Sequence, residues 1–189
     1  MKHFDYIASL YDRFAGQTDI GKLKVFLDLP VKGRLLDAAG GTGRHSVLLK
    51  TLADSLVVCD LSYPMLRVAR NGKGLDAVVA RIEGLPFPDG SFDRILMVDA
   101  FHHLSDQQGA IRELCRVLRP DGKMVIEEPD IRRPVVKMVC LFERLLFMES
   151  RFLAPETLMG RMQSMDMKAT LVGRDRFRAW ILVERDSGV

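Results

Sequence analysis

Cysteine is scarce in this sequence, and no group of residues has the spacing of a metal site. The 189 residues include three cysteines, Cys59, Cys115 and Cys140, which lie far apart inside apolar runs. Cysteines in such surroundings are typical of buried free thiols rather than of disulfides or metal ligands. We therefore expect no bound metal, and a reducing compartment, the cytoplasm.

Long apolar runs and a strong charge of one sign are also missing. No stretch of about 18 uncharged apolar residues occurs, so no membrane-spanning helix is expected. The N-terminal residues "MKHFDYIASLYDRF" lack the apolar core of a secretory signal peptide. The net charge of +3 is too small for a strong nucleic-acid footprint, so no nucleic-acid partner is expected.

The composition that is present is that of an ordinary soluble globular domain. Hydrophobic residues make up 48% of the chain and charged residues 28%. Repeats, low-complexity tracts and internal linkers do not occur in the sequence. Residues 1–189 are therefore expected to form one domain, as a monomer or a homodimer.

Strand-like and helical segments alternate along the first two thirds of the chain. Short apolar runs, several of which end in an acid, are separated by stretches with helical spacing of apolar residues. We expect Ser62 and Ser105 to cap helices, and residues 120–122, "PDG", to form a turn. The expected strands are 34–39, 55–60, 76–80, 93–99 and 123–128, and the expected helices are 44–54, 63–70 and 105–118.

Continuous runs of Val, Ile and Leu are typical of strands buried on both faces, as in a parallel sheet covered by helices. With right-handed crossovers, these elements predict a doubly wound α/β fold. Ligands of such sheets bind beyond the carboxyl ends of the strands. The acids at those ends are Asp37, Asp60, Asp99, Glu127 and Glu128.

The pattern changes after Pro129. Residues 135–148 are apolar nearly all round a helix, which is typical of a helix that is buried or lies against an apolar partner. Beyond core packing, such a helix could wall an apolar substrate pocket, form a dimer face or touch a membrane surface. The remaining expected elements are a helix over 155–165 and two strands within 168–185.

The segment "LLDAAGGTGRHS", residues 35–46, carries three glycines within four positions. Glycine lets the backbone approach a ligand closely, although a plain strand–turn–helix connection is the simpler interpretation. Asp60 follows Gly40 by 20 residues, roughly where a nicotinamide-binding fold places the acid that binds ribose hydroxyls. A P-loop is not indicated, because no Gly-Lys-Ser/Thr follows. Loop and acid together indicate a bound nucleoside without identifying it.

Four motifs occur in order at familiar spacings: "LLDAAGGTGR", "VVCDLSYPML", "EGLPFPDGSFDRILMVDAFHHL" and "RELCRVLRPDGKMVIEEP". Together, over residues 34–129, they resemble the type 11 small-molecule group of class I S-adenosylmethionine-dependent methyltransferases. The opening "FDYIASLYDRF" is similar to the lid helix of the ubiquinone/menaquinone C-methyltransferase-like branch, and residues 151–185 are similar to its terminal helix and strand pair. The resemblance implies a Rossmann-like methyltransferase fold with a mostly parallel seven-stranded sheet and helices on both faces.

The resemblance also implies that successive segments of the single domain have different roles. Residues 1–30 would form N-terminal lid helices, residues 31–130 the cofactor-binding core, and residues 131–189 a helical substrate-side region with a terminal strand pair. S-adenosylmethionine would be the cofactor and S-adenosylhomocysteine the product.

Contacts with the cofactor are implied motif by motif. Asp37 and the glycine-loop backbone would face the methionine part, and Asp60 would hold the ribose hydroxyls. Leu61 and Met65 would pack on the adenine, and Tyr11 either donates to the cofactor carboxylate or is a core aromatic. The residues implied to bind the cofactor are Tyr11, Asp37, Ala39, Gly40, Gly41, Gly43, Asp60, Leu61, Met65, Arg81, Ile82, Glu83 and Val98.

One segment departs from the family pattern. In the place where the family has Asp-Ala-Glu, this chain has Arg81, Ile82 and Glu83. The usual Asp accepts a hydrogen bond from the adenine amino group, and an arginine cannot accept one. Stacking of the Arg81 guanidinium or the backbone at Ile82 could replace that contact. We therefore expect weaker cofactor binding or a displaced adenine.

The candidate catalytic residues follow the fourth expected strand. Asp99 would lie beside the transferred methyl group, where it orients the substrate or caps the following turn. His102 or His103 could be a general base, since an unperturbed histidine titrates near about pH 6.5. In the alternative interpretation one histidine packs beneath the cofactor and the other is a solvated loop residue.

The sequence thus predicts methyl transfer from S-adenosylmethionine to a small, apolar acceptor, with a quinone-like or other aromatic ring as the first hypothesis. Peripheral contact with a membrane is compatible with the apolar segment 135–148. Two other functions stay open at this point. A non-catalytic, cofactor-binding member of the fold would keep the motifs, and a nicotinamide-dependent oxidoreductase would use the same loop and Asp60.

Overall fold

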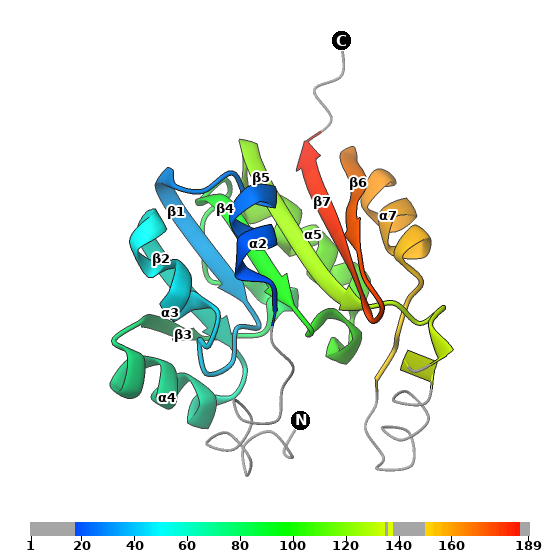
Figure 1. Cartoon of the computed structure of the whole chain (residues 1–189). Coiled ribbons are helices and arrows are strands. Elements are labelled where there is room, and N and C mark those ends of the chain that lie inside the picture. Colours follow the sequence, from blue (N-terminus) through cyan, green and yellow to red (C-terminus); the bar gives the residue numbers. More distant parts are fainter. Residues whose placement is uncertain (1–17, 135, 138–149, 186–189) are drawn as a thin grey trace.

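A seven-stranded sheet, in the order β3-β2-β1-β4-β5-β7-β6, is the frame of the structure (Figure 1). The computed structural model describes residues 18–134, 136–137 and 150–185. The strands are β1 Val31–Ala38, β2 Ala53–Asp60, β3 Asp76–Val79, β4 Phe92–Val98, β5 Leu118–Pro129, β6 Met167–Arg174 and β7 Arg178–Arg185.

Five of these strands form a parallel block. Neighbours from β3 to β5 run parallel, whereas β7 is antiparallel to both β5 and β6. The chain builds outward from β1 to β3 and then crosses to β4, so the order reverses between β1 and β4. The predicted doubly wound, mostly parallel seven-stranded sheet is confirmed, and its reversal point is where such sheets bind ligands.

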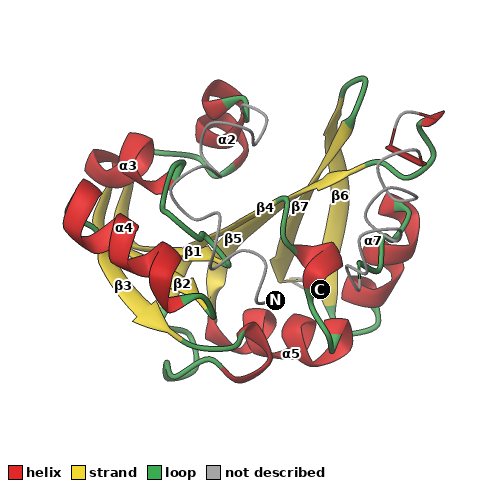
Figure 2. Ribbon diagram, turned by 90° about the horizontal axis from the view of Figure 1, so that it is seen from below, coloured by secondary structure: helices red, strands yellow, loops and turns green. Residues whose placement is uncertain are grey.

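Helices cover both faces of the sheet (Figure 2). Side chains alternate between two cores: Leu35 packs on the face of α2, α3 and α4, and Leu36 on the face of α5 and α7. This two-sided burial explains the continuous apolar runs of the central strands. The helices are α2 Ile20–Phe26, α3 Ser46–Leu49, α4 Tyr63–Lys73, α5 Gln107–Val117 and α7 Pro155–Gln163, with the 3₁₀ turns η1 Lys50–Leu52, η2 Ile82–Gly84 and η3 Phe101–His103.

The caps of α4 agree with the sequence. Ser62 accepts a hydrogen bond from the backbone N–H of Met65 at 3.4 Å, and Gly74 ends the helix with a left-handed φ of +62°. The helix therefore begins as predicted and continues to Lys73, beyond the expected end.

Three local predictions were wrong. The helix expected over 44–54 is limited to α3 and η1, because residues 53–54 join β2 alongside β1. Asp106, not Ser105, caps α5, since its carboxylate accepts from the N–H of Gly109 at 2.9 Å. The expected turn at 120–122 lies within β5, as an irregularity between the Phe92 and Arg94 pairings with β4.

None of the helices in the described ranges has the length and apolar character needed to cross a bilayer.

Candidate functional site

The glycine loop follows β1 at the carboxyl edge of the parallel block, as expected from its position in the sequence. Ala39, Gly41 and Gly43 have left-handed backbones, with φ of +58°, +54° and +67°. A Cβ on Gly43 would lie 2.4 Å from Cδ1 of Leu75, so no larger residue fits without a shift. Successive left-handed residues turn peptide groups toward one concave side, which suits a closely approaching ligand.

Asp37 supports this loop from within. Its side chain is only 2% exposed, and its Oδ2 accepts a hydrogen bond from Oγ of Ser46 at 2.5 Å. A Cβ on Gly40 would lie 2.5 Å from Cγ of Asp37, so the loop passes directly over the carboxyl group. Burial, reinforced by the charge of Asp60 and opposed by the Ser46 bond, raises the pKa of Asp37 to about 7. Its predicted contact with the methionine part of the cofactor stays a prediction.

Asp60, the last residue of β2, joins the loop to the start of α4. Its Oδ2 accepts from the N–H of Gly41 at 2.9 Å, and its Oδ1 accepts from the N–H of Ser62 at 2.8 Å. These two bonds fix the plane of the carboxylate. A carboxylate is an acceptor with two oxygens, which is the chemistry that two neighbouring hydroxyl groups of a ligand require.

Leu61, directly after Asp60, and Met65 in α4 differ in their exposure to solvent. Leu61 is 37% exposed although it is large and apolar, as a residue that packs on a flat ring would be. Met65 is buried, and a Cβ on Gly41 would lie 3.2 Å from its Sδ. Only Leu61 is therefore open to solvent, while Met65 supports the loop.

Arg81 follows β3, which lies beside β2 on the side away from β1, and its side chain is held by hydrogen bonds. Its Nη2 donates to Oγ of Ser105 at 2.6 Å and to Oε1 of Glu83 at 3.2 Å. The side chain of Ile82 is buried in the core, which leaves its backbone as the part that could face a ligand. Ser105, predicted as a helix cap, thus holds the segment that departs from the family pattern. The adenine contacts of this segment stay predictions.

Asp99 follows Val98 at the end of β4. Val98 is buried in the sheet core, whereas Asp99 is half-buried and has a left-handed backbone with φ of +54°. The N–H of Asp99 donates to the carbonyl of Glu127 on β5 at 2.8 Å. Asp99 therefore turns the chain out of the sheet at the point where the acceptor was expected.

His102 and His103 occupy η3, and neither is a solvated loop residue. His102 is 2% exposed, its Nδ1 lies 2.7 Å from Oε2 of Glu128, and its ring stacks on Phe152. Nδ1 of His103 lies 3.2 Å from Oγ of Ser150. Burial and the neighbouring His102 lower the pKa of His103 to about 3, so that it stays neutral near pH 7.

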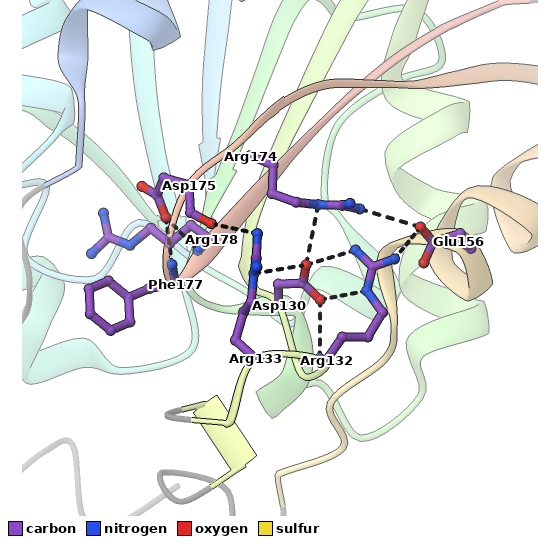
Figure 3. Close-up of polar contacts among 8 residues, drawn as sticks. All are labelled: Asp130, Arg132, Arg133, Glu156, Arg174, Asp175, Phe177 and Arg178. Carbon is purple, nitrogen blue, oxygen red and sulfur yellow. Dashed lines mark hydrogen bonds and ion pairs between the residues drawn. The ribbon is translucent and has the colours of Figure 1, made fainter.

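Side chains at the far end of the edge form a network that the sequence did not predict (Figure 3). Asp130 is 1% exposed and lies 2.7 Å from Nη2 of Arg132 and 3.3 Å from Nε of Arg174. Both arginines also reach Glu156 at the start of α7. Hydrogen bonds from Arg132 hold the pKa of Asp130 below its ordinary value. No signal in the sequence pairs residues so far apart.

Glu127 forms a second unpredicted cluster, on the opposite face of β5 from Glu128. It is fully buried and accepts from Nε1 of Trp180 at 2.8 Å and from Oγ1 of Thr18 at 3.2 Å. Nη1 of Arg178 lies 2.9 Å from its Oε1. Burial outweighs these partners and raises the pKa of Glu127.

Some predictions fall outside the described residues, namely those on Tyr11, Cys140 and most of the helix expected over 135–148. Cys59 and Cys115 are buried free thiols, as predicted. Within the described part of the chain, no three His, Cys, Asp or Glu residues gather as they would around a metal ion.

Comparisons with known proteins agree with this geometry. The family model of the type 11 methyltransferase domain matches residues 36–126. The chain is 31% identical to the ubiquinone/menaquinone biosynthesis C-methyltransferase UbiE of Hahella chejuensis, over 67% of this chain and 58% of that protein. It is 39% identical to the demethylmenaquinone methyltransferase of Thermus thermophilus, over 50% and 46% of the two chains. The chain thus spans about half the length of these curated relatives.

Solved structures show the same fold. An S-adenosylmethionine-dependent methyltransferase from Thermotoga maritima superposes with a TM-score of 0.80 at 22% identity, over 97% of this chain and 98% of that one. The YcgJ protein of Bacillus subtilis has a TM-score of 0.77 at 19% identity, over 88% and 97%. Residues 36–126 thus form a class I S-adenosylmethionine-dependent methyltransferase domain, and the chain is related to the ubiquinone/menaquinone C-methyltransferases.

S-adenosylmethionine is the cofactor of this family, and the residues at the loop fit it. The carboxylate of Asp60 is held by the N–H groups of Gly41 and Ser62, and a carboxylate is the acceptor that the two ribose hydroxyl groups require. Gly41, whose N–H donates to Asp60, has a left-handed φ of +54° that L side chains rarely adopt, so glycine suits the loop beside this carboxylate.

Proposed function

We propose that the protein transfers a methyl group from S-adenosylmethionine to a small apolar or aromatic acceptor in the cytoplasm, with a quinone-like ring as the first candidate. The observation that carries the cofactor part is the carboxylate of Asp60, held by two backbone N–H groups beside the left-handed glycine loop. The acceptor is supported by the relatives, which are named for ubiquinone, menaquinone and demethylmenaquinone. The buried free thiols of Cys59 and Cys115 support a reducing compartment.

When bound, S-adenosylmethionine supplies an activated methyl group and leaves as a neutral thioether, so the protein needs no acid to expel the leaving group. The chain's own work is then to bind and align. Asp60 accepts hydrogen bonds from the ribose hydroxyls, the backbone of residues 39–43 faces the methionine part, and Leu61 packs on the adenine. Asp37, buried under the loop, keeps the peptide groups in place.

On the acceptor side, Asp99 orients the acceptor at the end of β4. His103 has a pKa too low for a strong base, so in this proposal it is a neutral hydrogen-bonding group. His102, buried against Glu128, supports the residues that follow β4. Residues 31–130 carry the cofactor within one domain.

Calorimetry with S-adenosylhomocysteine tests the cofactor assignment. We expect binding to the parent protein and at least a tenfold weaker affinity in Asp60→Ala, because charge-assisted hydrogen bonds contribute about 1.5–3 kcal/mol each. Asp54→Ala, at the exposed start of the same strand, is the matched control and should bind like the parent. No binding at millimolar ligand would refute the assignment, and unchanged affinity in Asp60→Ala would refute the ribose role.

The same samples separate the alternatives. NADH should not raise the melting temperature, whereas S-adenosylhomocysteine should, because a ligand of the native state stabilises it by mass action. The reverse result would favour a nicotinamide-dependent oxidoreductase. Tight cofactor binding without turnover of any acceptor in a panel of quinols and other aromatic rings would favour a non-catalytic member of the fold.

A further inference from the structure

Glu128, near the end of β5, is a buried acid whose partners all belong to the segment that follows β4. Its side chain lies on the α5 face of the sheet, opposite Glu127, and the residue is only 8% exposed. Oε1 accepts from the N–H of Ala100 at 2.9 Å and from the N–H of Phe101 at 2.7 Å. Oε2 lies 2.7 Å from Nδ1 of His102. One carboxylate thus holds three consecutive residues.

The segment is held from other directions as well. The N–H of Arg151 donates to the carbonyl of His102 at 2.7 Å, and the His102 ring stacks on Phe152 at 4.2 Å between centroids and an interplanar angle of 14°. Nε2 of Gln107 donates to the carbonyl of Phe101 at 3.3 Å. His102 therefore joins the end of β5 to residues 151–152 through its buried ring and its backbone carbonyl.

These contacts also fix the positions of the two neighbouring residues, Asp99 and His103. Asp99, directly before the three held residues, keeps its left-handed φ of +54° while its N–H donates to the carbonyl of Glu127. His103, directly after them, lies 4.0 Å from the His102 ring between centroids. The conformation of Asp99 is uncommon for a residue other than glycine and persists only where neighbouring contacts hold it. β5 supplies those contacts, through one carbonyl and one carboxylate.

We propose that Glu128 is a positioning residue for methyl transfer: through the N–H groups of Ala100 and Phe101 and the ring of His102, it holds Asp99 and His103 against the acceptor. The inference rests on the proposed function, because Asp99 and His103 are placed beside the acceptor there. Glu128 itself touches neither cofactor nor acceptor. Its substitution should therefore lower kcat and leave cofactor binding alone.

Two variants separate the contact of Glu128 with the backbone N–H groups from its contact with the His102 ring. In Glu128→Gln, the amide oxygen can still accept from Ala100 and Phe101, but an NH₂ group replaces the oxygen that faces His102. In Glu128→Ala both contacts are lost. Glu113→Gln is the matched control, because Glu113 likewise accepts a backbone N–H, that of Leu85 at 2.8 Å, but outside residues 99–103.

The measurements are kcat and KM with a short-chain naphthoquinol as acceptor, calorimetry with S-adenosylhomocysteine, and amide hydrogen exchange at Ala100 and Phe101. We expect kcat to fall about 100-fold in Glu128→Ala, as a small misplacement of reacting groups does, and about tenfold in Glu128→Gln. The KM for S-adenosylmethionine and the affinity for S-adenosylhomocysteine should stay within about threefold of the parent. The two amides should exchange faster in Glu128→Ala and nearly as in the parent in Glu128→Gln and Glu113→Gln.

Parent-like kcat in Glu128→Ala would overturn the inference, and so would a loss of cofactor affinity equal to the loss of kcat. Failure of the proposed function looks different. A parent protein that does not bind S-adenosylhomocysteine refutes the cofactor assignment. A parent that binds it but does not methylate the naphthoquinol refutes the acceptor assignment and, with it, the role of Glu128 in this reaction. Amide exchange decides in every case whether Glu128 holds the segment.

Discussion

The two ends of the carboxyl edge of the sheet are built in different ways. Beyond β1 and β2 the backbone forms the surface, where the left-handed residues Ala39, Gly41 and Gly43 carry peptide groups past the carboxylate of Asp60. Beyond β5, β6 and β7 the edge is closed by side chains, as Figure 3 shows for the network around Asp130. The first end presents backbone and a carboxylate to a ligand, whereas the second largely satisfies its own charges.

The difference explains why two buried aspartates at opposite ends of this edge have pKa values shifted in opposite directions. Asp37 is buried beneath backbone with one hydroxyl donor, so its pKa is raised. Asp130 is equally inaccessible but has arginines as partners, so its pKa is lowered. Burial alone does not determine the charge of a carboxyl group, because the partners decide whether the charged form is favoured.

Gly43→Ala should be the most damaging change at the backbone-built end. The new Cβ would lie 2.4 Å from Leu75 Cδ1 on a backbone with φ of +67°. The left-handed conformation and overpacking together should lower the free energy of unfolding by about 3 kcal/mol, measured by urea denaturation. Gly84→Ala, where no atom lies within 4 Å of the added Cβ, is the control and should change stability little. Equal stability of both variants would contradict this account.

Asp130→Asn should break the side-chain network. Removal of the negative charge leaves Arg132 and Arg174 facing each other across Glu156, at a cost of about 2–3 kcal/mol near pH 7. Because the folded pKa of Asp130 is lowered, its contribution is present above the ordinary value of 3.8 and is lost as the pH falls through the folded pKa. The variant and the parent should therefore converge in thermal melts at acid pH.

Asp121→Asn is the control for these melts, because Asp121 is exposed, and its melting temperature should follow that of the parent at every pH. A deficit of Asp130→Asn that does not shrink toward low pH would mean that the network does not act through its charge.

Asp37→Asn should change stability in the opposite direction and make the folded protein more stable above neutral pH. The folded pKa of Asp37 is raised from 3.8 to about 7, so ionisation weakens the ligand-free fold progressively as the pH rises through that window. The variant should be more stable than the parent by about 2 kcal/mol at pH 8, because the gain is partly offset by a buried amide NH₂ that lacks a partner. Below about pH 4 the gain should be lost and the variant should be slightly less stable than the parent, because the cost of the buried amide remains while the parent carboxyl group is uncharged. Melting curves at pH 4, 6 and 8 measure it, and a gain that is independent of pH would exclude a titrating Asp37.

Ala39→Gly should give the smallest effect. Ala39 has a φ of +58°, which costs an L-residue roughly 1 kcal/mol relative to glycine, so the variant should be more stable by about that amount. Ala100→Gly is the matched control, because Ala100 has a φ of −139° and gains nothing from glycine. If Ala39→Gly is less stable than the parent, the loop is not strained at this position.

The parts of the molecule that could be predicted from the sequence are those with local signals. The glycines of the loop, the acid at the end of β2 and the cap Ser62 are each marked by the short segment around them, and the structure confirms their places in the fold. Ser105 and Asp106 show the limit of such signals. Both are good caps, and the choice between them depends on Arg81 and Glu83, which occupy Ser105 from another part of the chain.

The acceptor side could be predicted less well. Glu128 and His102 are 26 residues apart, and nothing in their local sequence indicates that one holds the other. The same holds for Asp130, Glu156 and Arg174, which meet because α7 and the hairpin of β6 and β7 pack beside β5. A buried carboxyl group acquires its pKa only from such a neighbourhood.

By itself, the sequence determined the alternation of strands and helices, the doubly wound sheet and the place of the glycine loop and Asp60 at the end of its first two strands, because periodicity, glycine and chain reversal are properties of short segments. The tertiary structure alone decided which acids carry charge, which histidine is buried against a carboxylate, and what holds Asp99 in its left-handed turn. Those outcomes depend on through-space partners and on exclusion of water, and both arise only when distant segments pack together.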